Sequence, residues 1–487
     1  QEDIESIVNQ IEKEEQKKLQ VVEKVITPPT RRAFSTLCAH PYKDELIMFG
    51  GEFHNGQETF VYNDLFVYKI VRDEWTLVKC PGAPPPRTAH QAITLGANKG
   101  EMWIFGGEFT TKTESQFYHY RDLWVFNIDD KKWTKVSAPG GPSARSGHRM
   151  VYIKKQLFVF GGYHDNLQDY KYFNDLYTFD MQTCVWTKLE PTGTPPSPRS
   201  GCQMVATPEG KIVIWGGYSK TKVKKGVDKG VVHSDMFLLS PDKNDMTGLK
   251  WKWSSVKPGG VKCEGRSGVS ATCWGGRAYT FGGSCDVETE EDVNAEFFNE
   301  LHSLDLKKLM WSEACLSGKK DGARKKRRRK ERVEGEDKEE TEDEEEKEEM
   351  SIDTSEQIVS QTVVDDGVFT MTIGPSQVEA TASGTHSQLN VTQNPHSRIN
   401  CALVVKSSKL YLYGGIFEDG DKQYTLCDFY SLDLHKLDEW KTLIPCDLDS
   451  QEWIESGEEM ETESDEDDDS NEDSEDENAE QVEEDST

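Results

Sequence analysis

A pair of adjacent glycines closes a short apolar run six times along the chain, and this repeat constrains the fold more than any other feature of the sequence. The pairs are Gly50 and Gly51, Gly106 and Gly107, Gly161 and Gly162, Gly216 and Gly217, Gly282 and Gly283, and Gly414 and Gly415. The first four pairs are 56, 55 and 55 residues apart, and the next intervals are 66 and 132 residues. Self-similarity at a nearly fixed period indicates stacked repeats, because one such unit is too small to bury its own faces.

Each glycine pair lies between other residues that recur with it. A tryptophan follows 25 to 37 residues later, at Trp75, Trp133, Trp186, Trp253, Trp311 and Trp440. An arginine precedes each pair by 16 to 19 residues, at Arg32 (or Arg31), Arg87, Arg145, Arg199, Arg266 and Arg398. An acidic turn opens a further strand-like run between glycines and tryptophan. One unit therefore predicts four antiparallel strands in about 50 residues. A residue that recurs once per unit is expected to have a structural role, so we assign one to the arginines.

These units resemble the Kelch repeat, and the resemblance covers residues 32–316 and 397–443. It implies an all-β fold, a six-bladed β-propeller of four-stranded antiparallel blades. The glycines would take backbone dihedrals closed to other residues, and the tryptophans would pack between blades. Each unit contains its four strands in order, so the ring need not be closed by a strand borrowed from the other terminus. The resemblance implies no particular activity.

Composition separates the repeats from charged appendages. The chain has 88 acidic and 57 basic residues and a net charge of -31, and 22 of the acids lie in residues 444–487. Low hydrophobicity and high charge predict disorder. The predicted domains are 1–29, a charged amphipathic segment; 30–318, blades 1 to 5; 319–396, a disordered basic, acidic and Ser/Thr-rich insertion; 397–443, blade 6; and 444–487, a disordered acidic tail. The apolar spacing over 2–27 predicts a helix, and a solvated leader is the alternative.

Several function classes are disfavoured by what the sequence lacks. No apolar run approaches the length of a membrane helix, and no Gly-rich loop opens a helix to hold phosphate. The eleven cysteines form no C-x-x-C pair or zinc-ligand spacing, so we expect reduced thiols, with Cys202, Cys273 and Cys401 buried in apolar strands. We predict no catalytic site, no metal and no cofactor.

Loops that differ between units are where specificity must lie. The loops after the glycine pairs of units two to four carry aromatic, histidine and lysine side chains typical of protein interfaces. The candidate partner-binding rim is Phe117, Tyr118, His119, Tyr120, His164, Tyr170, Tyr172, Phe173, Lys222, Lys224 and Lys225. An alternative is that the aromatic residues cap blade edges and the lysines only solvate loops.

A basic run follows unit five, at Arg324, Lys325, Lys326, Arg327, Arg328, Arg329 and Lys330. It is typical of a nuclear import signal. A nucleic-acid contact and a loop neutralised by Glu334–Glu349 are the alternatives, and nucleic-acid binding elsewhere on so acidic a chain is disfavoured. We therefore expect a cytoplasmic or nuclear protein, or one in both compartments.

The features together predict a monomeric, noncatalytic scaffold or adaptor that binds a protein partner through its blade loops. One alternative is a substrate receptor for a ubiquitin ligase, a role that other Kelch proteins have. The other is an enzyme or ligand-binding propeller centred on the channel, which a polar and nonperiodic channel lining would favour.

Overall fold

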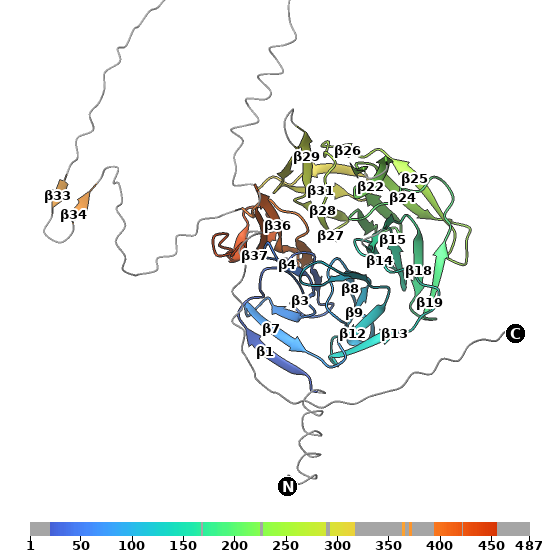
Figure 1. Cartoon of the computed structure of the whole chain (residues 1–487), viewed down its shortest axis with the longest axis horizontal. Helices are drawn as coiled ribbons and strands as arrows, with labels where there is room; N and C mark the ends of the chain where they lie inside the picture. Colours follow the sequence, from blue (N-terminus) through green and yellow to red (C-terminus); the bar gives the residue numbers. More distant parts are fainter. Residues whose placement is uncertain are drawn as a thin grey trace, which may run out of the picture.

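The computed structural model describes residues 20–166, 169–224, 227–288, 293–316, 363–365, 370–372, 394–420 and 422–454. Six antiparallel sheets stand in a ring, in chain order, around a central axis (Figure 1). The predicted six-bladed, all-β propeller is confirmed. Apart from the single 3-10 turn η1 (Ala97–Lys99), the labelled elements of the described residues are strands.

Each blade contains four strands, which follow one another in chain order from the innermost strand outward. Blade 1 contains β2 (Thr36–Ala39), β3 (Glu45–Phe49), β6 (Leu65–Lys69) and β7 (Glu74–Lys79); blade 2 contains β8 (Gln91–Leu95), β9 (Glu101–Phe105), β12 (Leu123–Asn127) and β13 (Lys132–Val136). Blade 3 contains β14 (Arg149–Ile153), β15 (Gln156–Phe160), β18 (Leu176–Asp180) and β19 (Val185–Leu189); blade 4 contains β20 (Gln203–Ala206), β21 (Ile212–Trp215), β24 (Met236–Pro241) and β25 (Trp251–Val256). Blade 5 contains β27 (Ser270–Trp274), β28 (Arg277–Phe281), β31 (Leu301–Asp305) and β32 (Met310–Glu313); blade 6 contains β35 (Ala402–Lys406), β36 (Lys409–Asp419), β37 (Lys422–Asp433) and β38 (Lys441–Ile444).

A two-stranded hairpin follows the glycine pair of every blade. The first five hairpins are β4 (Glu52–His54) with β5 (Thr59–Val61), β10 (Glu108–Thr110) with β11 (Phe117–His119), β16 (Tyr163–Asp165) with β17 (Tyr170–Tyr172), β22 (Tyr218–Lys224) with β23 (Val227–Val232), and β29 (Ser284–Glu288) with β30 (Val293–Phe297). In blade 6 the long strands β36 and β37 continue past a bulge to form the sixth. The loops that differ in sequence from unit to unit are therefore equivalent hairpins at one end of the blades.

The ring closes by packing, without a shared strand. The innermost strand β2 of blade 1 contacts β35 of blade 6, as neighbouring inner strands do elsewhere in the ring. The four strands of blade 1 lie within residues 36–79, and the four strands of blade 6 lie within residues 402–444. Neither blade therefore takes a strand from the other, as predicted. Two strands are added outside this pattern: β1 (Val22–Ile26) pairs antiparallel with β7, and β26 (Gly259–Gly260) pairs parallel with β32.

Strand β1 corrects the helix predicted over residues 2–27. Residues 22–26 are extended, and Val22 and Val25 are exposed on the outer edge of blade 1. The apolar spacing fits a helical period, but the unpaired edge of β7 offers backbone hydrogen bonds that an isolated helix end lacks. Residues 1–19 of the predicted helix lie outside the described part of the chain.

Five of the six glycine pairs donate a backbone hydrogen bond to the next blade, which approaches their backbone closely. In blade 2, Gly106 and Gly107 have φ angles of 64° and 95°, in the region that favours glycine. A Cβ atom on Gly106 would lie 2.8 Å from the carbonyl oxygen of Arg145 in blade 3. The N–H of Gly107 donates to that same oxygen at 2.9 Å. The same bond joins Gly415 of blade 6 to Arg32 of blade 1 at 3.2 Å, across the point where the ring closes.

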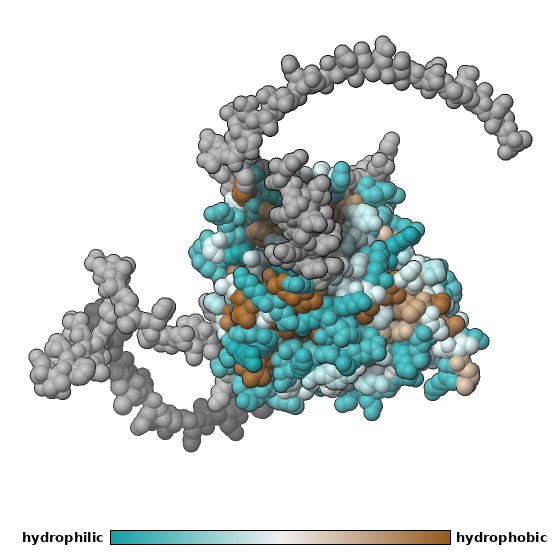
Figure 2. Space-filling view, turned by 90° about the horizontal axis from the view of Figure 1, so that it is seen from below, coloured by the Kyte–Doolittle hydropathy of each residue, from teal (hydrophilic) through white to brown (hydrophobic). Residues whose placement is uncertain are grey.

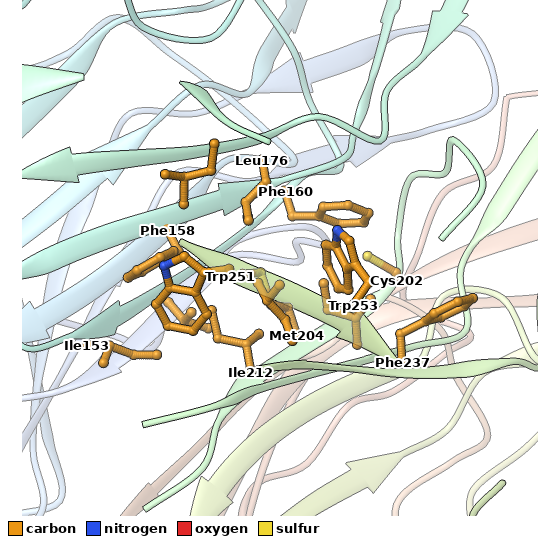
Figure 3. Packing of buried hydrophobic residues seen from close by; sticks show 14 residues of the cluster. Ile153, Phe158, Phe160, Leu176, Cys202, Met204, Ile212, Phe237, Trp251 and Trp253 are labelled. Carbon is orange, nitrogen blue, oxygen red and sulfur yellow. The ribbon is translucent and has the colours of Figure 1, made fainter. Parts of the chain in front are cut away.

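The tryptophans fill the space between blades, as predicted. Each packs on the aromatic residue that precedes the glycine pair of the blade before it; Trp253, for example, lies 5.6 Å from Phe160, between ring centroids. Figure 3 shows this contact within the cluster between blades 3 and 4, where Phe158 of β15 also faces Trp251 of β25. Burial of such large aromatic surfaces between blades stabilises the ring.

The six arginines fasten the turns of their own blades. The guanidinium of Arg145 donates to Asp175 of the acidic turn, with Nη1 2.6 Å from Oδ1, and to the carbonyl oxygen of Gly161 at 3.0 Å. Arg87, Arg199 and Arg398 repeat this arrangement with Asp122, Asp235 and Asp428; Arg266 pairs with Glu300, and Arg32 lies 3.6 Å from Asp64. The structural role predicted from their periodicity accounts for all six.

On the side shown in Figure 2, the surface of the described residues is mostly hydrophilic, with separate hydrophobic areas. Within this part of the chain, no helix has the length and apolar character needed to cross a membrane. In the insertion predicted to be disordered, β33 (Val363–Asp365) pairs antiparallel with β34 (Thr370–Thr372), so six of its residues have regular structure. The basic run Arg324–Lys330 lies outside the described residues.

Candidate functional site

The first residue of each hairpin has an equivalent position, and in blades 2, 3 and 4 it lines the hairpin end of the central channel. A backbone bridge joins it to the residue that follows the repeat arginine, as between Thr88 and Glu108. The six equivalent residues are Glu52, Glu108, Tyr163, Tyr218, Ser284 and Ile416. Because these positions share one backbone geometry but differ in chemistry, they make this end of the propeller asymmetric.

The channel itself is a cavity of about 790 Å³ lined by the innermost strands of all six blades. Its lining includes Glu108, Tyr163 and Tyr218 at the hairpin end and Arg149 on β14. Arg149 is the only lysine or arginine among these lining residues, and burial lowers its pKa. The channel could therefore hold a small polar ligand. Among the described residues, no group of three or more His, Cys, Asp or Glu side chains is placed to hold a metal ion.

Glu108 joins the hairpins of blades 2 and 3. Its carboxylate accepts hydrogen bonds from Ser146 Oγ at 3.0 Å and from the Tyr163 hydroxyl at 3.1 Å. Nδ1 of His119 lies 3.5 Å from Oε2 of the same carboxylate. Burial raises the pKa of Glu108 to about 7 and lowers that of His119 to about 4, with the neighbouring His164 also lowering the latter. At neutral pH His119 is therefore an uncharged ring, and its Nε2 accepts the N–H of Asp165 at 3.0 Å.

Glu52 occupies the equivalent position in blade 1. Burial, and secondarily the charge of Glu108, raise its pKa to about 8. A folded-state pKa above the ordinary value of 4.5 means that the folded protein holds this proton more tightly than the unfolded chain between about pH 4.5 and 8. The contribution of Glu52 to stability is therefore complete below pH 4.5 and is lost as the pH rises to 8.

We expect the Glu52→Gln variant to be more stable than the parent at pH 8.5, by about 1 to 2 kcal/mol of unfolding free energy, because glutamine carries no charge to desolvate. At pH 5 the two proteins should be nearly equal. Denaturant unfolding at both pH values measures this difference. Glu418→Gln, on an exposed residue of the blade 6 hairpin, is the matched control and should have little effect at either pH. An equal effect of Glu52→Gln at both pH values would contradict the assignment.

A groove of about 700 Å³ lies between the hairpins of blades 2 and 3. It brings together five residues of the predicted rim: Phe117, Tyr118, His119, His164 and Phe173. Phe117 and Tyr118 of β11 are exposed by 37% and 62%, and the rings of His119 and His164 lie 4.7 Å apart across the two hairpins. We call this the rim groove. Arg121 and Lys171, which were not among the predicted site residues, also line it.

Two predicted rim residues, Tyr120 and Phe173, make a structural contact with an arginine. The ring of Tyr120 lies under the guanidinium of Arg87 at 4.2 Å, and Phe173 lies under Arg145 at 4.1 Å. Both side chains are buried, and the Tyr120 hydroxyl donates to the carbonyl of Pro86. These aromatic faces stabilise the buried cations, which corrects the expectation that Tyr120 offers a partner an exposed ring.

The remaining rim residues point to blade 4. Tyr170 and Tyr172 of β17 lie outside the rim groove and contact each other edge to face. Nζ of Lys222 lies 2.8 Å from Asp169 and 5.3 Å from the Tyr170 ring, so this lysine joins the hairpins of blades 3 and 4. Lys224 ends β22, and Lys225 lies outside the described residues. The structure therefore divides the predicted rim into a groove and a separate inter-hairpin contact.

Sequence reasoning missed the two acids at the channel end, although an acidic residue follows the glycine pair in units one and two. It also missed the hydrogen bonds of Arg31 to Cys446 and Ser450, which are 415 and 419 residues away, because nothing in the sequence near Arg31 indicates these partners. Cys202 and Cys401 are buried as predicted, whereas Cys273 on β27 is exposed and lines the channel.

Comparison with known proteins supports Kelch repeats in the first four blades. Residues 35–250 match the model of the KLHDC2/KLHL20/DRC7 Kelch-repeats domain. Acyl-CoA-binding domain-containing protein 5 of Arabidopsis thaliana is 28% identical over 190 residues, which cover 38% of this chain and 27% of that protein. Human Kelch domain-containing protein 3 is 29% identical over 204 residues, covering 40% of this chain and 50% of that protein. Human Rab9 effector protein with kelch motifs is 33% identical over 159 residues, covering 32% and 40%. The match thus spans half or less of each relative.

Proposed function

We propose that this Kelch-repeat propeller is a noncatalytic scaffold or adaptor that binds a protein partner at the rim groove. The observation that carries the proposal is the groove itself, where two exposed aromatic side chains, Phe117 and Tyr118, stand beside a concave surface of about 700 Å³. Aromatic residues and arginine are enriched at the centres of protein interfaces, and a few such side chains supply most of the binding free energy.

The charge of the groove favours a particular kind of partner. The lining cations Arg121 and Lys171 are exposed, whereas the lining acid Asp165 is half-buried and its backbone N–H bonds His119. We therefore infer a partner segment that presents a carboxylate next to an apolar or aromatic side chain, because each would find a complementary group within the groove.

The relatives support the protein-binding class and leave the partner open. One of them is named as an effector of Rab9, and from that name we take only the proposal that this chain also binds a protein. Three segments have sequences similar to those of Kelch domain-containing protein 4 and its fungal relatives: Gly50–Phe53, Gln116–Tyr120 and Arg199–Met204. We propose that the chain falls in that group. We further propose that it acts as a monomer in the cytoplasm, the nucleus or both, with the basic run as the import signal.

We expect the double variant Phe117→Ala/Tyr118→Ala to bind its partner about 10- to 30-fold more weakly, since truncation of an aromatic anchor costs about 1 to 2 kcal/mol or more. Partners are first recovered from native extract on the full chain at elevated salt, and the Kd of the recovered partner is then measured for each variant. Tyr120 and Phe173 are left unchanged, because their replacement would disturb buried arginines.

Tyr42→Ala is the matched control for this test. Tyr42 is 64% exposed and lies in the turn between β2 and β3, at the opposite end of the strands from the hairpins. It should leave the Kd unchanged. If the rim variant and the control bind the partner equally well, the rim groove is not the binding site.

The channel supports a second candidate function, the binding of a small ligand or substrate. The observation that favours it is the unequal lining, with one cation, Arg149, and one carboxylate, Glu108, in a cavity of about 790 Å³. Mutation distinguishes the rim groove from the channel as the binding site. If Arg149→Gln loses partner binding and the rim variant keeps it in full, the partner binds at the channel.

A further inference from the structure

A short segment that follows β38 joins blade 6 to blade 1, the two blades at which the ring closes. We call Pro445–Ile454 the strap. Its Gln451 side chain accepts the backbone N–H of Thr425 at 2.9 Å and donates to the carbonyl of Gln423 at 2.8 Å, both on β37. The N–H of Ile454 then donates to the carbonyl of Asn55 in the blade 1 hairpin at 2.9 Å. The strap thus crosses from blade 6 to blade 1, where no shared strand closes the ring.

Two thiols face each other where the strap begins. The Sγ atoms of Cys427, on β37, and Cys446, in the strap, are 3.3 Å apart. The backbone N–H of Cys427 also points to Cys446 Sγ at 3.4 Å. Both residues are half-buried, so a small solute can reach them. A disulfide between them would need only a small movement of either side chain.

A cation lies against one of these sulfurs. Nη1 of Arg31 is 3.1 Å from Cys446 Sγ, and Nη2 of the same guanidinium bonds Ser450 Oγ at 2.6 Å. The hydrogen bond from the Cys427 thiol, the Cys427 N–H and the Arg31 charge together lower the pKa of Cys446 to about 6, although burial and the charge of Asp428 act in the other direction. The same shared hydrogen bond raises the pKa of Cys427. At neutral pH Cys446 is thus the thiolate, and Cys427 keeps the proton.

We propose that Cys446 and Cys427 form a peroxide-sensitive dithiol whose reversible disulfide fixes the strap to blade 6. The Cys446 thiolate attacks one oxygen of hydrogen peroxide, an S–O bond forms, the O–O bond breaks, and hydroxide leaves and is protonated to water. The sulfur of Cys427 then attacks the resulting sulfenic acid. The S–S bond forms, the S–O bond breaks, and a second water leaves with the proton of the Cys427 thiol. The two thiols lose two electrons, and the peroxide gains them.

The disulfide would tie the strap at its first turn, close to the bonds that Arg31 and Gln451 make with it. The strap is also the first part of the predicted acidic tail, residues 444–487, and lies directly before residue 455. Oxidation would therefore limit how far the origin of the tail can move from the blade 6 hairpin, and reduction by a thiol would release it.

The test is limited oxidation of the full chain by hydrogen peroxide, followed by digestion and mass spectrometry without reduction. We expect a peptide pair linked through Cys427 and Cys446, lighter by two hydrogens than the sum of its parts, that dithiothreitol separates. Hydrogen exchange of the Gln451 and Ile454 amides should slow several-fold in the oxidised protein. Appearance of sulfinic acid on Cys446 without the linked pair, or unchanged exchange of the strap after linkage, would overturn the proposal.

Substitution of Arg31 tests whether its charge lowers the pKa of Cys446. Alkylation of Cys446 should have a midpoint near pH 6 in the parent protein, and Arg31→Gln should move this midpoint upward and slow the peroxide reaction. An unchanged midpoint would contradict the role of Arg31. Cys184→Ser, which removes an exposed thiol of blade 3, is the matched control and should leave the linked peptide unchanged.

Discussion

Replacement of Trp133 by alanine is expected to lower the unfolding free energy by about 3 to 5 kcal/mol, which is a large part of the stability of a domain. The indole is only 6% exposed and lies between two blades, 5.3 Å from the Phe49 ring of blade 1 and 4.7 Å from Phe126 of its own blade. Its removal leaves a cavity that both blades border, so neither can close it without moving the other. Chemical denaturation monitored by circular dichroism measures the loss.

The control for this prediction is Trp124→Ala in the same blade. Trp124 is half-buried, its indole N–H donates to Asp122 at 2.8 Å, and water can occupy part of the space that it vacates. We expect the cost of this variant to be clearly smaller. Equal costs for the two variants would show that contact between blades is not what makes Trp133 important.

Removal of the carboxylate partner of Arg398 is expected to be comparably damaging. In blade 6, Arg398 and Asp428 form a two-pronged ion pair with N–O distances of 2.5 and 2.7 Å, and the two side chains are 0% and 4% exposed. Asp428→Ala leaves a guanidinium buried without a counter-charge, which costs about 3 to 5 kcal/mol. The free energy of unfolding of the variant, from denaturant titration, gives the value.

Blade 1 contains the weaker version of the same pair and serves as its control. Nη2 of Arg32 lies 3.6 Å from Oδ2 of Asp64, and the Asp64 side chain is 36% exposed. Because water can replace part of this interaction, we expect Asp64→Ala to cost about 1 kcal/mol or less. A loss at Asp428 no greater than that at Asp64 would mean that the repeat ion pairs contribute little, whatever their burial.

The propeller could be predicted from the residues alone, because those that build a blade recur. Trp133 packs on the aromatic residue before the glycine pair of the preceding blade, as its five counterparts do, so one position in a unit explains six in the structure. The bond from Gly107 to the next blade recurs in five of the six blades. A second recurring position carries the same kind of information. Tyr62, Tyr120 and Phe173 each precede the acidic turn by two residues, and each covers an arginine. This spacing separates Tyr120 and Phe173 from the exposed residues of the rim.

The side chains that meet across blades and at the closure of the ring could not be predicted in this way. Phe117 and His164 could be assigned to one rim from their loops, but that they line one groove while Tyr170 contacts Lys222 of blade 4 depends on how neighbouring hairpins stand side by side. Arg31 and Cys446 are 415 residues apart, yet the guanidinium reaches the sulfur because blade 1 packs on blade 6. Local sequence patterns predict the environment that a residue shares with its counterparts in the other repeats. Contacts between nonequivalent residues depend instead on how the blades pack and how the whole ring closes.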